Sequence, residues 1–262
     1  MNNPPTQDQQ FITQYKKLFL NNIHEIKIII SSITNEVKIS DDFIQILLLV
    51  YQVIILEDLP AIETLITSDL LLAASKTCRS ILEISAITSY LYKLDSVERK
   101  TKSRSFIDFT GGEVRQTGKS TEYDWLKTTT NISIKDIIIA QGLDLKNIID
   151  FGFTDDHGKQ IKLSIYDLLS KIVHYNPKFL TQLVRVNRKK FQTYYPPAYI
   201  YVYATTILAT IHSTIQFCLI FLEHLHPSAY QKEKEQLVKM YSELTSNLHI
   251  FSEEYKTYLK SE

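Results

Sequence analysis

The chain has 262 residues, 44% hydrophobic and 22% charged, so it can bury a full core as one large domain or two small ones. Its 29 basic and 29 acidic side chains give zero formal net charge, which excludes a global positive field that would hold a polyanion. Only 6 glycines and 7 prolines leave little turn chemistry for the hairpins of a β-sandwich, so we expect an all-α fold.

Apolar periodicity predicts three helices and a short fourth in the first 110 residues. The first runs from Gln7 to about Ile33. The second, largely apolar, ends near Pro60, which suits the first turn of a third helix. That third helix continues to about Lys93, with an interruption near Ser68-Asp69. The charged stretch LDSVERKTKSR and the following SFIDFT then indicate a short solvated helix with a partly buried end.

The interval 111–157 is the least regular part of the chain, because it holds five of the six glycines. Short helices are expected at Ser133 to Ala140 and at Asp144 to Phe151, the second with Asp144 as N-cap. Neither flanking half has enough apolar helices for an independent domain. We therefore interpret 111–157 as an insertion or lid within one all-α domain that spans 1–262.

Three further helices are expected after the insertion. A short one spans roughly Leu163 to Tyr175 and is stopped by Asn176-Pro177. A long one opens at Pro196-Pro197 and ends at His226-Pro227. A final amphipathic helix covers about Ser228 to Leu248, and a weaker helical tail follows it.

The stretch from Phe191 to Leu222 carries no formal charge if His212 is neutral, and it is long enough to cross a bilayer. It also contains many hydroxyls and amides, among them Thr206, Thr210 and Gln216, so we interpret it as the central helix of a soluble bundle. The start MNNPPTQDQQ lacks the basic and apolar regions of a signal peptide. We therefore expect a cytoplasmic protein without membrane contact.

Several motif matches do not carry a site. The segment Gly112-EVRQT-Gly118-Lys119-Ser120 has five residues between its glycines where a phosphate loop has four. His224-x-His226 lacks a third ligand, and Asp155-Asp156-His157 is typical of a solvated turn. Cys78 and Cys218 lie in apolar runs without zinc-binding spacing, which suits a reducing cytosol. No metal or cofactor is expected.

Two spacings of four residues carry the strongest functional signal. Arg79 and Glu83 lie on one face of a largely apolar helix, where an arginine is costly unless it is paired. Glu83 would fix the guanidinium and leave donors for a second acceptor such as a phosphate. Tyr166, Ser170 and His174 form a polar line along another apolar helix, in which His174 could act as general acid or base.

The two polar groups are expected to meet, since each alone would be an unsatisfied pair in an apolar segment. The same residues suit a purely structural role, because a buried Arg-Glu pair tied to a serine and a histidine commonly fixes helix register. Both interpretations remain open on the residues alone.

The segments RSILEISAITSYLY, ERKTKSRSFIDF and YDLLSKIVHYNP resemble, in this order, a bacterial domain-of-unknown-function family related to the HEPN (higher eukaryote and prokaryote nucleotide-binding) superfamily. The resemblance extends from about Leu71 to Leu180. It implies an all-α fold with a polar pocket formed by Arg79, Glu83, Ser170 and His174. It also implies a role in bacterial stress, toxin-antitoxin or phage-defence systems.

The chain departs from HEPN ribonucleases in one respect: no arginine lies four to six residues before His174. If Arg79 takes that place from the other helix, metal-independent RNA cleavage would use His174 for proton transfer and Arg79 for the phosphorane charge. The alternative is a non-catalytic nucleotide-binding or protein-interaction module. A homodimer would often supply a composite cleft in such proteins, and an antitoxin or other protein is the expected partner.

A basic segment before the long helix is a second candidate for RNA or nucleotide contact. Its cations lie beside Phe191, Tyr194 and Tyr195, whose rings could stack on bases. With zero net charge on the whole chain, a solvated connector before a helix is the simpler explanation of the segment. The candidate binding residues are Tyr166, Arg185, Arg188, Lys189 and Lys190.

Overall fold

The computed structural model describes residues 7–33, 43–110, 132–140, 153–154, 160–161, 165–174, 180, 185–187, 190–192, 196–226 and 228–261. The helices are α1 Gln7–Ile33, α2 Phe43–Thr67, α3 Leu71–Lys93, α4 Ser96–Thr110, α6 Ile134–Ala140, α7 Ile165–Val173, α9 Pro196–Leu225 and α10 Gln231–Ser261. The strands form two short antiparallel pairs, β1 Phe153–Thr154 with β2 Gln160–Ile161 and β3 Arg185–Asn187 with β4 Lys190–Gln192. The predicted all-α fold is confirmed.

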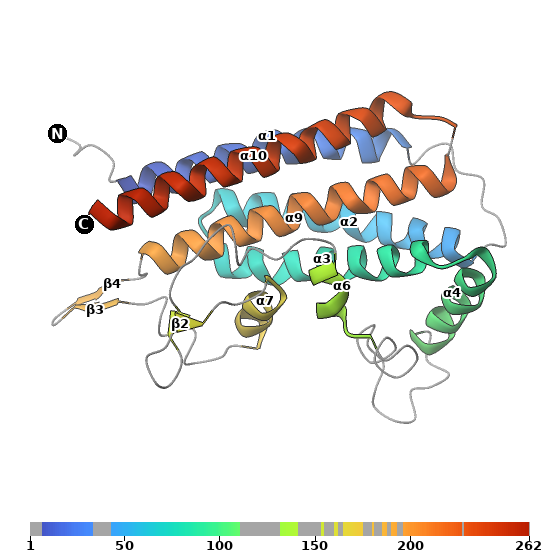
Figure 1. The fold of residues 1–262 in the computed structure, drawn as a ribbon, viewed down its shortest axis with the longest axis horizontal. Helices are drawn as coiled ribbons and strands as arrows, with labels where there is room; N and C mark the ends of the chain where they lie inside the picture. Colours follow the sequence, from blue (N-terminus) through green and yellow to red (C-terminus); the bar gives the residue numbers. More distant parts are fainter. Residues whose placement is uncertain are drawn as a thin grey trace.

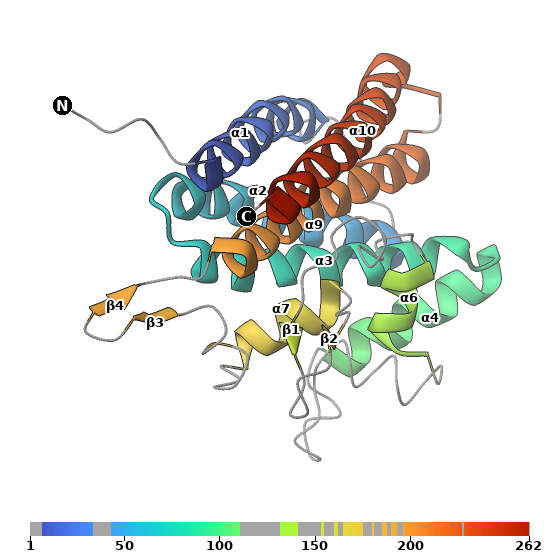
Figure 2. The same cartoon turned by 60° about the vertical axis from the view of Figure 1, so that its left-hand side comes forward.

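Helix α9 is the centre of the bundle and contacts α1, α2, α3, α7 and α10. Figures 1 and 2 show α1 and α10 side by side on one side of α9, with α3 on the other. The shorter helices α6 and α7 pack against the side of α3 that faces away from α1 and α10. Residues from all of these helices contribute to one cluster of buried apolar side chains.

The boundary between α2 and α3 differs from the sequence prediction. Pro60 lies inside α2, which continues to Thr67, so the predicted end near Pro60 was wrong. Leu59, Ile62 and Ile66 are fully buried on both sides of the proline, and this packing outweighs the missing backbone donor. The chain breaks instead at Asp69, whose φ is 59°, close to the predicted interruption.

The turn after α2 closes that helix by a pair of backbone hydrogen bonds. The N–H of Leu70 donates to the carbonyl of Leu65 at 2.8 Å, and the N–H of Asp69 donates to that of Ile66 at 3.2 Å. This is the Schellman pattern, here with an aspartate in the left-handed position that glycine usually takes. Lys16 of α1 holds the turn through Asp69 Oδ1 at 2.9 Å and the carbonyl of Thr67 at 3.0 Å.

The hydroxyls of α9 are buried inside protein. Thr206, Thr210 and Thr214 each donate to the carbonyl four residues before, and Thr206 also meets Ser75 of α3 at 2.7 Å. The prediction that this helix is central is therefore confirmed. By length and composition two helices could cross a membrane, Phe43–Thr67 and Tyr199–Leu225. In the second, however, 89% of the most apolar 18-residue stretch is buried inside the protein.

The irregular interval contributes one described helix to the bundle, as predicted. Helix α6 begins with a reciprocal cap in which Asp136 N–H donates to Ser133 Oγ at 3.1 Å and Ser133 Oγ donates to Asp136 Oδ2 at 2.6 Å. Ile134, Ile137 and Ile138 then enter the common core. The helix predicted from Asp144 to Phe151 lies outside the described residues.

His212 is a buried titratable side chain on α9. It is 6% exposed, and its ring stacks on Tyr241 of α10 with a centroid distance of 4.7 Å. Among the described residues, its Nδ1 has no hydrogen-bond partner. Burial disfavours the charged imidazolium and lowers the pKa of His212 from 6.5 to about 4.

We expect His212 to make the protein sensitive to acid. Between pH 6.5 and 4 the imidazole is protonated in the unfolded chain and neutral in the folded one, so the unfolded state binds more protons and the free energy of unfolding falls as pH is lowered. His212 should lower the free energy of unfolding by roughly 3 kcal/mol between pH 7 and pH 4. The His212→Phe variant, which keeps a ring against Tyr241, should lose that part of the pH dependence in urea-unfolding measurements.

The exposed His24 of α1 supplies the matched control. The His24→Phe variant should retain the pH dependence of the wild-type protein. If the free energy of unfolding has the same slope against pH in the wild type and in His212→Phe, His212 is not the source of the acid sensitivity.

Candidate functional site

Helix α3 positions Arg79 and Glu83 one turn apart, as their spacing predicts. Arg79 Nε donates to Glu83 Oε1 at 2.7 Å, and the two side chains are 16% and 24% exposed. This contact is local to one helix, so it forms wherever α3 forms. The pair therefore presents a fixed guanidinium at the edge of the core.

Helix α7 completes the site by packing against α3. Arg79 Nη2 donates to the Tyr166 hydroxyl at 3.0 Å, and Arg79 Nη1 lies 3.3 Å from His174 Nε2. The guanidinium carbon is also 5.0 Å from the centroid of the Tyr166 ring. The Tyr166 hydroxyl in turn lies 3.5 Å from Glu83 Oε1. Arg79 thus joins three partners from two helices.

The contact between Arg79 and His174 fixes the role of Nε2. A guanidinium can only donate, so Nε2 must accept, and the proton of the neutral imidazole then lies on Nδ1. His174 is exposed, just beyond the end of α7, while Tyr166 is 8% exposed. The cluster therefore has an inner side made by Tyr166 and Glu83 and an outer side at His174.

The charge of Arg79 is maintained by its neighbours. Burial, the largest influence, lowers the Arg79 pKa, but the negative charge of Glu83 and the contacts with Tyr166 together raise it above its ordinary value. The guanidinium is consequently a permanent cation at every pH at which the protein is folded. Such a group can hold a phosphate oxygen without changing its own protonation.

Ser170 takes a smaller part than its spacing predicts. It lies on α7 between Tyr166 and His174, and its backbone carbonyl accepts the His174 N–H at 3.0 Å. Among the described residues its hydroxyl makes no hydrogen bond to the other members of the cluster. Ser170 therefore helps to place His174 through the backbone.

The basic candidates lie elsewhere. Arg185 and Lys190 are in β3 and β4, whose register pairs Arg185 with Gln192 and Asn187 with Lys190. Figures 1 and 2 show this strand pair projecting beyond the end of the bundle. Arg188 and Lys189 fall outside the described residues, as do Gly112 to Ser120 and Asp155-Asp156-His157. Across the part of the chain that is described, no three potential metal ligands form a group.

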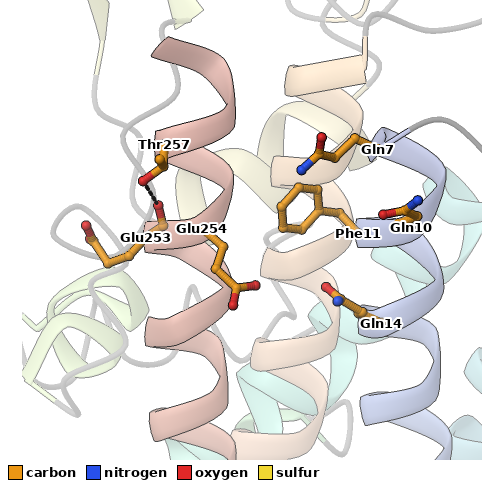
Figure 3. A pocket seen from close by; sticks show the side chains of 7 residues that line it. All are labelled: Gln7, Gln10, Phe11, Gln14, Glu253, Glu254 and Thr257. Carbon is orange, nitrogen blue, oxygen red and sulfur yellow. Dashed lines mark hydrogen bonds between the residues drawn. The ribbon is translucent and has the colours of Figure 1, made fainter. Parts of the chain in front are cut away.

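Two surface cavities were not anticipated from the sequence. One, of about 590 Å³, lies between α1 and α10 (Figure 3) and is lined by Gln7, Gln10, Phe11, Gln14, Glu253, Glu254 and Thr257. In Figure 3 Glu254 extends toward α1, whereas Glu253 points away from it. Amides and carboxylates without a cation make this cavity unsuitable for a phosphate.

The other cavity, of about 780 Å³, lies where α1, α3 and α9 begin, and its lining includes Lys16, Asp69, Lys76 and Tyr199. One sequence signal could have pointed to it: Lys76 precedes Arg79 by three residues and therefore shares its face of α3. None of Arg79, Glu83, Tyr166 and His174 lines this cavity.

Comparisons with known proteins give no relative: no family model matches the chain, and neither a curated protein nor a solved structure shows significant similarity to it.

Proposed function

We propose that this chain is a HEPN-like helical protein of bacterial stress, toxin-antitoxin or phage defence that cleaves RNA without a metal ion at Arg79 and His174. The observation that carries the proposal is the 3.3 Å contact between Arg79 Nη1 and His174 Nε2 on the exposed edge of the α3–α7 cluster. It brings a permanent cation and an imidazole together from residues 95 positions apart. In this proposal Arg79 of α3 takes the place of the arginine that is missing from the motif before His174.

The proposed chemistry begins when a phosphodiester replaces His174 as the acceptor for Arg79 Nη1. His174 Nε2 is then free to take the proton of the 2′-hydroxyl, and the 2′-oxygen attacks the adjacent phosphorus. The bond from phosphorus to the 5′-oxygen breaks, and that oxygen takes a proton from water. The hydroxide that remains takes the proton from His174, which regenerates the neutral imidazole. The products are a 2′,3′-cyclic phosphate and a 5′-hydroxyl. Arg79 stabilises the charge that develops on the phosphorane oxygens.

Glu83 and Tyr166 act as positioning residues in this scheme. Glu83 accepts from Nε, and Tyr166 accepts from Nη2 and lies under the guanidinium plane. Because Glu83 and Tyr166 bind two nitrogens of the Arg79 guanidinium, its third nitrogen, Nη1, can donate to a ligand at the exposed edge. This division of contacts suits phosphate recognition at the exposed edge.

A non-catalytic role is the second candidate, and the number of Arg79 partners favours it. Arg79 already binds Glu83, Tyr166 and His174, so the cluster can serve as a structural link between α3 and α7 or as a nucleotide-binding or protein-interaction surface. We include in the proposal a cytoplasmic location and a protein partner such as an antitoxin.

The test is an RNA cleavage assay with purified protein in excess EDTA. A 5′-labelled single-stranded RNA should be cut to fragments that end in 2′,3′-cyclic phosphate, and chelation should not slow the reaction. Replacing the 2′-hydroxyls by hydrogen, in a DNA of the same sequence, should abolish cleavage because the attacking group is removed. Absence of cleavage, or cleavage of that DNA, would exclude the proposed reaction.

A further inference from the structure

Helix α2 exposes a row of apolar side chains to solvent. The helix packs against α1, α3, α4 and α9 with its other sides. The exposed side carries residues spaced three and four positions apart, which therefore lie in one row along the helix. We call this row the α2 stripe, and it consists of Phe43, Ile46, Val50 and Val53. The last three are 37%, 51% and 53% exposed.

The exposure of the α2 stripe contrasts with the burial of the other strongly apolar helix. Only 44% of the most apolar 18-residue stretch of α2 is buried, against 89% in α9. The sequence carries no charged residue from Phe43 to Leu56, and the partly buried Leu49 and Ile54 lie beside the stripe. Contiguous exposed apolar side chains typically mark an interaction surface. The α2 stripe is therefore a candidate interface.

The two ends of the α2 stripe carry opposite charges. At its beginning, the guanidinium carbon of Arg104 on α4 lies 5.5 Å from the centroid of the Phe43 ring. The ion pair of Arg104 with Asp108 is long, at 3.8 Å, and leaves the Arg104 side chain 67% exposed. At the other end the exposed Glu57 continues the row, about 21 Å along the helix from Phe43.

This charge distribution makes the α2 stripe complementary to a second copy of itself. Val50 is the midpoint of the row from Phe43 to Glu57. If two α2 helices meet antiparallel on a twofold axis at Val50, the beginning of each stripe lies against the end of the other. Glu57 of each protomer then approaches the partner's Arg104. A parallel arrangement would bring like charges together, so the charges favour the antiparallel one.

A second copy fits this surface better than a lipid bilayer does. The uncharged run from Phe43 to Leu56 is shorter than the roughly 20 residues that a membrane span needs. A bilayer would also leave Glu57 at an apolar boundary, whereas a second copy supplies Arg104 as its cation. An uncharged centre with charged residues at the rim is typical of interfaces between proteins.

We propose that two copies of this chain form an antiparallel dimer through their α2 stripes, with Val50 at the twofold axis and an ion pair between Glu57 and the partner's Arg104 at each end. The stripe is about 21 Å long and one helix wide, so it buries less than the roughly 800 Å² per partner of a stable interface. The dimer is consequently weak, with a Kd of about 10 to 100 μM.

This interface is separate from the Arg79 cluster. None of Arg79, Glu83, Tyr166 and His174 lies on α2. Figures 1 and 2 show α7 on the other side of α3 from α2. The dimer therefore does not form a composite cleft at the cluster, unlike the dimer expected from the sequence resemblance. It does not depend on RNA cleavage.

Sedimentation equilibrium of the full chain between about 1 and 200 μM measures the dimer. The Val50→Glu variant places two carboxylates against each other at the twofold axis and should raise the Kd at least tenfold. Because Val50 is 51% exposed, the protomer should stay folded. The matched control is Val238→Glu, the same change at a 55% exposed valine on α10, which should dimerise as the wild type does.

Charge reversal tests the antiparallel arrangement. Glu57→Arg and Arg104→Glu should each raise the Kd by about three- to tenfold, because like charges then meet at both ends of the interface. The double variant restores opposite charges and should regain the Kd of the wild type. A double variant as weak as the two single ones would contradict the antiparallel pairing.

Two further results would overturn the proposal. The first is a wild-type protein that remains monomeric at about 200 μM, or that associates no better than Val50→Glu while Val238→Glu does the same. The second comes from co-sedimentation with phosphatidylcholine vesicles. Monomeric protein that binds these vesicles, and loses this binding in Val50→Glu, would assign the α2 stripe to a membrane surface instead.

Discussion

Replacing His174 by alanine is expected to lower the rate of RNA cleavage by about 100- to 10,000-fold, the range that a positioned general base contributes. The fold should be unaffected, because His174 is exposed and follows the last residue of α7. Substitutions at such positions usually change the free energy of unfolding by less than about 0.5 kcal/mol. Single-turnover cleavage rates and thermal unfolding of the same preparations measure both quantities.

The matched control for this experiment is His24→Ala. His24 is an exposed histidine on α1, so the substitution removes the same side chain at a position remote in the sequence from the α3–α7 cluster. Its cleavage rate should equal that of the wild type, which also tests for a contaminating ribonuclease. Equal rates in His174→Ala and wild type would falsify the role of His174 as the base.

Replacing Arg79 by methionine is expected to affect both activity and stability. Cleavage should be lost, because no cation remains to stabilise the phosphorane. The free energy of unfolding should fall by roughly 2 to 4 kcal/mol, since the change leaves the partly buried Glu83 carboxylate without its cation. The expected loss is below that of a fully enclosed pair because Glu83 keeps 24% exposure and some contact with water.

A double variant separates the catalytic role of Arg79 from its structural role. In Arg79→Met/Glu83→Gln the unpaired carboxylate is gone, so most of the lost stability should return while cleavage stays absent. If the double variant regains cleavage together with stability, Arg79 serves only the packing of α3 against α7. Chemical denaturation and RNA cleavage assays of the single and double variants supply the comparison.

Arg104 provides a control for removing an arginine from a helical ion pair. Arg104 and Asp108 have the same four-residue spacing in α4, but their charged atoms are 3.8 Å apart and both side chains are more than half exposed. Arg104→Met should therefore cost less than about 1 kcal/mol and leave cleavage unchanged. The contrast with Arg79→Met measures the effect of burial at the cluster.

Within α3 the sequence was sufficient to predict the contact between Arg79 and Glu83. Arg79 and Glu83 are four residues apart in a helix, and helical geometry alone places their side chains together. The polar line Tyr166, Ser170 and His174 was predicted on the same basis. In each case the relevant contacts are local, and the pattern of apolar residues around them specifies the helix.

The prediction that the two polar groups meet is confirmed, but the spacings did not show which members of the second group contact Arg79. Among the described residues Arg79 contacts Tyr166 and His174 but not the Ser170 hydroxyl, although the three follow one another at four-residue intervals along α7 and the residue after it. That choice depends on the angle and register at which α7 packs against α3, which are set by the side chains of the whole interface. Tertiary packing also explains why α2 continues through Pro60. Burial of the residues on both sides of the proline keeps the helix continuous, although the local sequence favours an end there.

The sequence by itself determined the helical class, most helix bounds and the pairing of Arg79 with Glu83, because each follows from contacts within a few residues along one helix. The sequence also predicted that the two polar groups meet, and this is confirmed. Only the tertiary structure decided which atoms of the two groups make contact and that a cavity opens beside Lys76. Both features join residues that are distant in the sequence, and their geometry results from how α1, α3, α7 and α9 share one core.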